Sequence, residues 1–152
     1  MMNNANIDEK KNPDQKFPLE HSIFIMWKPE YNLGIPIIDE HHRGIVSIIN
    51  SLHFGMQNKH SKDTLTPIVE MMKSYTRIHF QVEESFLEMT GFPNAKKHND
   101  LHIELLSLLA QSGRNSMTDH DPSQFMALLK QWWINHICCE DLVYKNHFLT
   151  LK

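Results

Sequence analysis

The chain has 152 residues, of which 41% are hydrophobic, and this is enough for a single domain with a substantial core. Its formal net charge of -3 argues against a basic nucleic-acid-binding surface, and no apolar run approaches the roughly 20 residues of a membrane span. We therefore expect neither nucleic acid nor a membrane as a partner, and the sequence leaves the oligomeric state open, a monomer included. The N-terminus lacks the basic and apolar regions of a signal peptide, so we expect a cytosolic (cytoplasmic) protein in which Cys138 and Cys139 are reduced.

The N-terminal part of the chain is not helical in pattern. Residues 1–20 are polar, which is typical of a flexible tail, and we assign residues 21–152 to one bundle domain. An arm follows at residues 24–38, where prolines and a glycine prevent a continuous helix. Because this arm also carries Trp27 and Tyr31, we expect it to pack across the rest of the domain.

Two helices are predicted next from apolar residues that recur every three or four positions. The first begins near Asp39, a candidate N-cap. The second begins near residues 64–67 and ends at residues 91–93, which read Gly-Phe-Pro.

Two further helices follow. The third spans about residues 95–112, and residues 113–121 are predicted to form a loop. The fourth has Pro122 in its first turn and Asp121 as a candidate N-cap. Four helices with short loops predict an all-α fold, an up-down-up-down four-helix bundle with the arm packed across it.

Seven residues with metal-binding side chains recur along these helices at helical spacing. Residues four apart lie on one face of a helix, so the HxxxE and HxxxH patterns each present two such groups to the same side. Buried ionisable groups are costly unless they are paired or bound to a metal, so this set predicts a metal site inside the bundle. The candidate ligands are His42, His79, Glu83, His98, His102, His136 and Asp141.

The pair His136 and Asp141 is five residues apart. In a regular helix this spacing turns the two side chains about 140° from each other. We therefore expect a local widening of the fourth helix between them, which would bring both groups to one centre.

Imidazole and carboxylate ligands suit iron, manganese, zinc or copper. If both carboxylates bridge two metal ions and the ions share one oxygen bridge, five imidazoles fill all but one of the twelve positions of two octahedral ions. One vacancy on one metal suits a small ligand such as dioxygen.

These residues resemble the hemerythrin family, specifically the bacterial hemerythrins, over about residues 24–148. In that family a ligand histidine lies three residues after an aspartate and three before an apolar residue, so Asp39 and Ile45 select His42 rather than His41. Besides the arm residues Trp27 and Tyr31, the matching motifs are Gly34-Ile-Pro-Ile-Ile-Asp-Glu-His-His42, His79-Phe-x-x-Glu83-Glu84, Gly91-Phe-Pro93, His98-x-x-x-His102 and Trp132-x-x-x-His136-Ile-x-x-x-Asp141-x-x-Tyr144.

The resemblance implies two non-haem iron ions bridged by an oxo or hydroxo group. His98, His102 and His136 would hold the coordinatively full iron, His42 and His79 the open one, and Glu83 and Asp141 would bridge. The implied function is reversible dioxygen binding by a carrier, a store or a sensor, without enzymatic turnover, and dioxygen is the implied partner.

Two alternatives compete with this function. A ferritin-like diiron oxidase would use ExxH motifs and four or more carboxylates, and this chain has no ExxH motif at suitable places. A nitric oxide or iron-stress protein of the iron–sulfur repair type would be richer in glutamate ligands and often carries an N-terminal cysteine-bearing domain. Neither feature occurs in this sequence.

Three groups beside the ligands carry weaker expectations. Glu84 and Glu140 adjoin ligands but point elsewhere on a regular helix, so we expect both to be solvated. Trp133 stands where the family usually has leucine, and we expect its side chain to face the open iron. Cys138 and Cys139 are expected to be fillers rather than redox groups.

Overall fold

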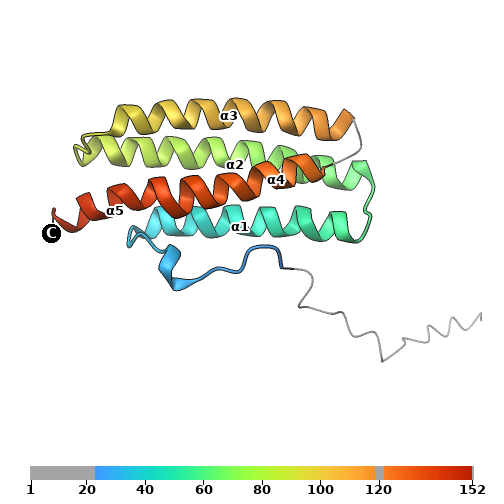
Figure 1. Cartoon of the computed structure of the whole chain (residues 1–152), viewed down its shortest axis with the longest axis horizontal. Coiled ribbons are helices and arrows are strands. Elements are labelled where there is room, and N and C mark those ends of the chain that lie inside the picture. Colours follow the sequence, from blue (N-terminus) through green and yellow to red (C-terminus); the bar gives the residue numbers. More distant parts are fainter. Residues whose placement is uncertain (1–22, 119–121, 152) are drawn as a thin grey trace, which may run out of the picture.

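The computed structural model describes residues 23–118 and 122–151, so the predicted tail at residues 1–20 and the candidate cap Asp121 lie outside the described residues. Figure 1 shows helical rods that pack side by side along one long axis, and the described residues contain no strand. In chain order the elements are the 3-10 turn η2 (Pro29–Tyr31), α1 (Pro36–Gln57), α2 (Lys62–Met89), α3 (Ala95–Thr118), α4 (Ser123–Trp132), the π-helix η3 (Trp133–Glu140) and α5 (Asp141–Leu149).

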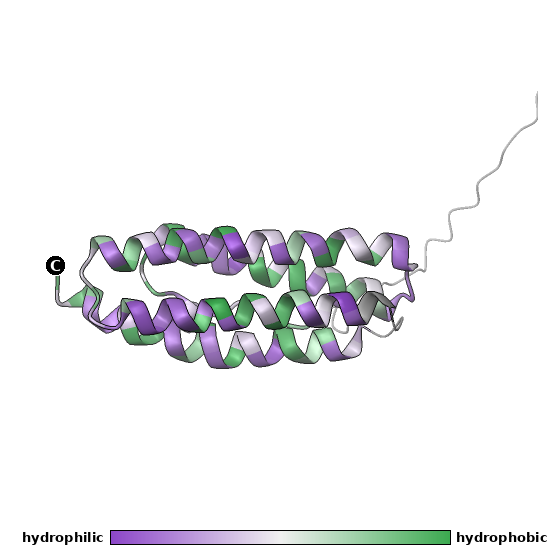
Figure 2. Cartoon of the chain, turned by 90° about the horizontal axis from the view of Figure 1, so that it is seen from above, coloured by the Kyte–Doolittle hydropathy of each residue, from purple (hydrophilic) through white to green (hydrophobic). Residues whose placement is uncertain are grey.

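The last three elements form one continuous rod, so the molecule is the predicted four-helix bundle. Each helix packs on the next one in the chain, α1 on α2, α2 on α3 and α3 on α4, and successive rods run in opposite directions (Figure 1). Figure 2 shows hydrophobic and hydrophilic bands alternating along each rod, as expected for helices with one buried face. None of the described helices combines the length and hydropathy of a membrane span.

Two apolar clusters fill the bundle and leave the candidate site between them. The larger contains Ile49, Phe80 and Trp132, and the smaller contains Leu87 and Tyr144 near the other end. All five of these side chains are 2% exposed or less. The clusters exclude water from both sides of the polar groups between them.

The start of α1 differs from the prediction. The helix begins at Pro36, with proline in its first turn, and Asp39 lies one turn inside it rather than at its N-cap. The Asp39 carboxylate instead accepts hydrogen bonds from the backbone N–H groups of Leu33, at 2.6 Å, and Gly34, at 3.0 Å. Asp39 therefore caps the turn before the helix and fixes the angle at which the arm meets α1.

The third helix is longer than predicted, because it continues through Gly113 to Thr118. Gly113 is buried, and a Cβ atom there would lie 3.2 Å from Cγ1 of Val69 and 3.7 Å from Phe125. Gly113 is therefore a point of close packing against α2 and α4, and the prediction that it lies in a loop is wrong.

Asn50 of α1 holds the arm in place. Its side-chain oxygen accepts hydrogen bonds from the backbone N–H groups of Phe24, at 2.9 Å, and Ile25, at 2.8 Å. Its side-chain N–H donates to the Ile25 carbonyl at 2.8 Å. The side-chain amide of Asn50 thus satisfies backbone groups of the arm that have no helix or sheet partner.

The arm is also held by an aromatic group, which confirms that it packs across the bundle. The ring centroid of Trp133 lies 6.0 Å from that of Trp27 and 5.4 Å from that of Tyr31, and both contacts are edge-to-face. The Arg43 guanidinium lies over the Trp27 ring at 4.6 Å from its centroid. Trp133 is 4% exposed, and its large side chain fills the space between the arm and the fourth rod.

We predict that Asn50→Ala loosens the arm. It removes three partly buried hydrogen bonds, each worth about 0.5–1.5 kcal/mol, so the free energy of unfolding should fall by about 2–3 kcal/mol. The measurement is denaturant unfolding of the two proteins. Ser51→Ala is the control, since the exposed Ser51 hydroxyl only donates to a carbonyl of its own helix. Equal losses for the two variants would contradict the role of Asn50.

Candidate metal centre

The structure brings all seven predicted ligands to one place in the bundle interior. His42 comes from α1, His79 and Glu83 from α2, and His98 and His102 from α3. The fourth rod supplies His136 from η3 and Asp141 from the first position of α5. Five of the side chains are 0% exposed, and the other two, His98 and His136, are 4% and 3% exposed.

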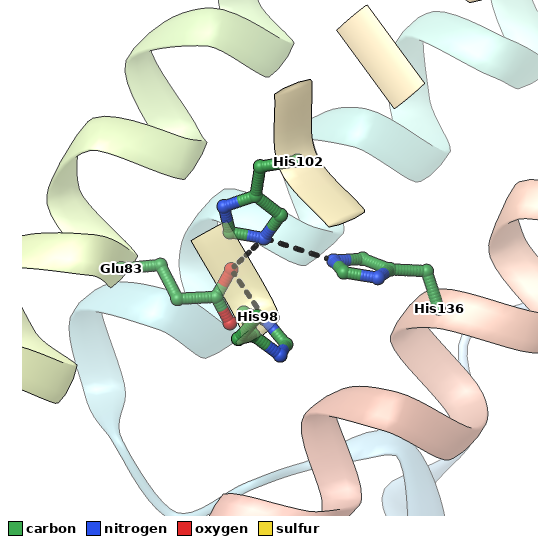
Figure 3. Close-up of side chains that lie close together, drawn as sticks. All are labelled: Glu83, His98, His102 and His136. Atoms are coloured by element: carbon green, nitrogen blue, oxygen red, sulfur yellow. Dashed lines mark hydrogen bonds and ion pairs between the residues drawn. The ribbon is translucent and has the colours of Figure 1, made fainter. Parts of the chain in front are cut away.

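The seven groups divide into two sets that each have the dimensions of a metal site. One set is Glu83 with His98, His102 and His136, which Figure 3 shows pointing toward one another. In it, Nε2 of His102 lies 3.2 Å from Oε2 of Glu83 and 3.0 Å from Nε2 of His136. The other set is His42, His79, Glu83 and Asp141. Glu83 belongs to both sets, so the two sites adjoin.

Asp141 also faces both sets, with one oxygen toward each. Its Oδ2 lies 3.2 Å from Nε2 of His42. Its Oδ1 lies 3.4 Å from Nε2 of His98 and 3.3 Å from Nε2 of His136. A carboxylate in this position can bridge two ions.

The π-helix explains how Asp141 reaches this position. A π turn joins residues five apart, and the backbone N–H of Asp141 donates to the carbonyl of His136. Residues that a regular helix would turn apart therefore share one face. The expected widening of the fourth helix is confirmed.

The chemistry of the donor atoms fits metal ions better than it fits a protein core. Buried nitrogen and oxygen atoms almost always have hydrogen-bond partners. Here six converging ligand atoms are buried without one: Nε2 of His42, His79 and His98, Oε2 of Glu83, and both carboxylate oxygens of Asp141. Such atoms are the ones that a pair of cations would satisfy.

The electrostatics of the histidines differ with their neighbours. Burial lowers the pKa of His79 to about 3, so this imidazole is neutral, as a metal ligand must be. Burial also tends to lower the pKa of His98, but contacts with Asp141 and Glu83 outweigh it and raise this pKa to about 9. Without a cation, His98 therefore carries a proton between two carboxylates.

Both carboxylates stay ionised. Burial tends to raise the pKa of Glu83, but the close imidazoles of His102, at 3.2 Å, and His98, at 3.7 Å, hold it well below the usual range. Tyr144 donates its phenolic hydrogen to Oε1 of Glu83. Burial, followed by the nearby charges of Asp141 and Glu83, raises the pKa of Tyr144 well above its usual value, so the phenol keeps its proton.

Sequence reasoning missed the partner of Glu84, whose side chain is 30% exposed and therefore only partly solvated. Its Oε1 lies 2.9 Å from Nδ1 of His102, whose other ring nitrogen, Nε2, faces Glu83 and His136 in the cluster. Phe80 stacks on the same imidazole, with ring centroids 3.7 Å apart and an interplanar angle of 1°. Together they hold the ring of His102 in place. The sequence does contain a signal for this contact. Glu84 directly follows the predicted ligand Glu83, on a helix expected to pack beside the helix that carries His102. Glu140, by contrast, is exposed as expected.

Two other expectations concern residues beside the ligands. His42 rather than His41 faces the cluster, while His41 packs against Tyr75 and His79 at ring distances of 5.8 Å. Trp133 packs on the arm, so the observed contacts do not support the expectation that it faces the site. The tryptophan beside the site is Trp132, which lies edge-to-face on Phe80 at 6.0 Å.

The fold and the cluster define a class of protein, a four-helix bundle with a histidine-rich cluster in its core that could hold metal ions. The family model described as the hemerythrin HHE cation binding domain matches residues 33–148. The chain therefore belongs to the hemerythrin family, whose members bind a non-haem diiron centre.

Known relatives agree with this assignment. A protein named bacteriohemerythrin from Stenotrophomonas maltophilia (strain R551-3) is 28% identical over 123 residues, which cover 80% of each chain. One from Pseudomonas aeruginosa (strain LESB58) is 29% identical over 79% of this chain and 78% of its own. A hemerythrin from Sipunculus nudus is 26% identical over 80% of this chain and 91% of its own.

We predict that Glu84→Gln weakens metal binding without abolishing it. A carboxylate on the second nitrogen of a metal-bound histidine fixes the ring and raises its basicity, and losing it typically costs 10–100-fold in metal affinity. Equilibrium competition with a chelator measures this affinity. Glu88→Gln is the matched control, four residues along the same helix and exposed. An unchanged affinity in Glu84→Gln would show that the His102 contact has no such effect.

We also predict proton release from His98. A histidine whose pKa is about 9 when folded and about 6.5 when unfolded stabilises the metal-free protein fully below pH 6.5, and this contribution is lost as the pH rises through 9. Because a metal must displace that proton, Zn²⁺ should release roughly 0.7 more protons per chain at pH of about 7.5 than at about 9.5. A pH indicator measures the release. Equal release at both values would contradict the raised pKa of His98.

Proposed function

We propose that this chain binds two non-haem iron ions, joined by an oxo or hydroxo bridge, and uses them to bind dioxygen reversibly. The observation that carries the proposal is the unequal division of the cluster. Three imidazoles lie on one side of Glu83 and Asp141 and two lie on the other. With shared bridges, unequal sets leave one ion a ligand short, and a small molecule can bind there.

The proposed roles follow from the two sets. His98, His102 and His136 would hold the full iron, and His42 and His79 would hold the open one. Glu83 and Asp141 would bridge, as their shared contacts support. When bound, a pair of ferrous ions supplies the two electrons that dioxygen accepts.

The protein residues around the site favour binding over turnover. Apolar side chains cover the cluster at both ends, and this limits the access of water, which promotes irreversible oxidation of the iron. The phenol of Tyr144 keeps its proton and gives its hydrogen bond to Glu83, so Tyr144 is not a ready acid for further reaction. The cluster offers two carboxylates, Glu83 and Asp141, fewer than the four glutamates of ferritin-like diiron sites.

The relatives named bacteriohemerythrin and hemerythrin also favour an oxygen-binding role over an enzymatic one. Whether this chain acts as a carrier, a store or a sensor stays open within the proposal. The cytosolic location also stays a prediction.

The test of this function is an anaerobic optical titration of the diferrous protein with dioxygen, followed by removal of the gas. We expect a coloured form to appear with about one dioxygen per two irons, and the colourless form to return. His79→Ala, at a proposed ligand of the open iron, should lose the coloured form, while His53→Gln, at a ring that stacks on Phe24 in the arm, should keep it. Irreversible oxidation of the unchanged protein by the first equivalents of oxygen would overturn the proposal.

A further inference from the structure

The cluster is not equally sealed on all sides. His98 and His136 are the two ligands with any measurable exposure, and they lie on the flank where α3 meets the fourth rod. On the opposite flank His42 and His79 are 0% exposed, and His41 packs between Tyr75 and His79. Solvent therefore comes nearest to the cluster from the side of α3, η3 and α5.

Two hollows lie on this flank and each reaches one of these ligands. One, of about 130 Å³, is lined by His98 together with Phe92 and Val143. The other, of about 180 Å³, is lined by His136 together with Leu105 and Leu108. A water molecule takes up about 30 Å³ in the liquid, so each hollow has room for a few waters or a partly hydrated ion.

Leu101 and Glu140 line both hollows, so the two hollows are neighbours on this flank, and together we call them the groove. Glu140, which lines both hollows, is exposed, and so is Glu104, which lines the hollow that reaches His136. Asn94 and Asn135 add amide groups, and Lys97 is the one cation among the lining residues. On the inner side of His98, its Nε2 is buried without a hydrogen-bond partner and faces Glu83 and Asp141 of the cluster.

We propose that this groove is the path by which ferrous ions reach and leave the metal centre. Glu140 is the carboxylate on which an incoming ion exchanges part of its hydration shell. Leu101 is the neck between that carboxylate and the buried imidazoles. His98 and His136 are the first permanent ligands that the ion meets, so the three-histidine set loads first.

The chemistry of the groove supports a cation rather than another ligand. Carboxylate and amide oxygens are suitable ligands for a hydrated divalent ion, and imidazole suits iron once the ion has lost water. The donor types thus change from oxygen at the surface to nitrogen inside, in the order in which an ion would exchange its waters. A neutral gas would gain nothing from Glu140 or Glu104.

This inference rests on the proposed diiron function, and its test uses the fully loaded protein. The diferrous protein is mixed without oxygen with isotopically labelled Fe²⁺, and the exchange of bound for labelled iron is followed by mass spectrometry. An ion that leaves must cross the same barrier as one that enters. Glu140→Gln should therefore slow the exchange by at least about fivefold, within the range by which local charge changes ion rates. Its iron content at equilibrium should not change.

Two further variants make the result specific. Leu101→Ala widens the neck and should speed the exchange, while Glu88→Gln, an exposed glutamate of α2 outside the lining residues, should exchange at the original rate. Exchange at the original rate in both Glu140→Gln and Leu101→Ala would overturn the inference. So would a loss of bound iron at equilibrium in Glu140→Gln, because Glu140 would then act on the site itself. Reversibility of oxygen binding is measured without any exchange step, so failure of one proposal is distinct from failure of the other.

Discussion

The burial of five imidazoles and two carboxylates at one point is the constraint on which the rest of this structure depends. Each such group loses hydration inside the bundle, and six of the ligand atoms have no hydrogen-bond partner in return. The anionic carboxylates and the proton on His98 offset one another only in part. Two bridged cations would satisfy these atoms, and the apolar clusters at both ends then strengthen the electrostatic interactions by excluding water.

The rest of the fold places the ligands at this point. Three rods present them through ordinary helical spacing, and the fourth uses a π segment to bring His136 and Asp141 together. Glu84 and Phe80 fix the ring of His102 from behind. The arm, anchored by Asn50 of α1, packs on the bundle and brings Trp27 and Tyr31 against Trp133. Stability and site geometry are therefore built from the same packing.

The helical pattern was enough to predict the bundle and the seven converging residues, because i and i+4 spacing fixes the face of a helix without knowledge of its partners. It also required the widened turn before Asp141, while the family motif selected His42 over His41. The pattern failed where tertiary neighbours decide. Gly113 lies in a helix at a point of close packing against Val69, and Glu84 contacts His102 because α3 lies beside α2. Trp133 packs on an arm whose position no local pattern specifies.

The central claim is that the cluster holds two ions with the carboxylates between them. The most direct test is a crystal structure of the iron-loaded protein with anomalous scattering at the iron edge. It should show two irons per chain, about 3.5–4 Å apart or closer, as in other two-metal sites. His98, His102 and His136 should bind one iron, His42 and His79 the other, and Asp141 should give one oxygen to each. A single iron, His41 as a ligand, or Asp141 bound to one iron alone would contradict the claim.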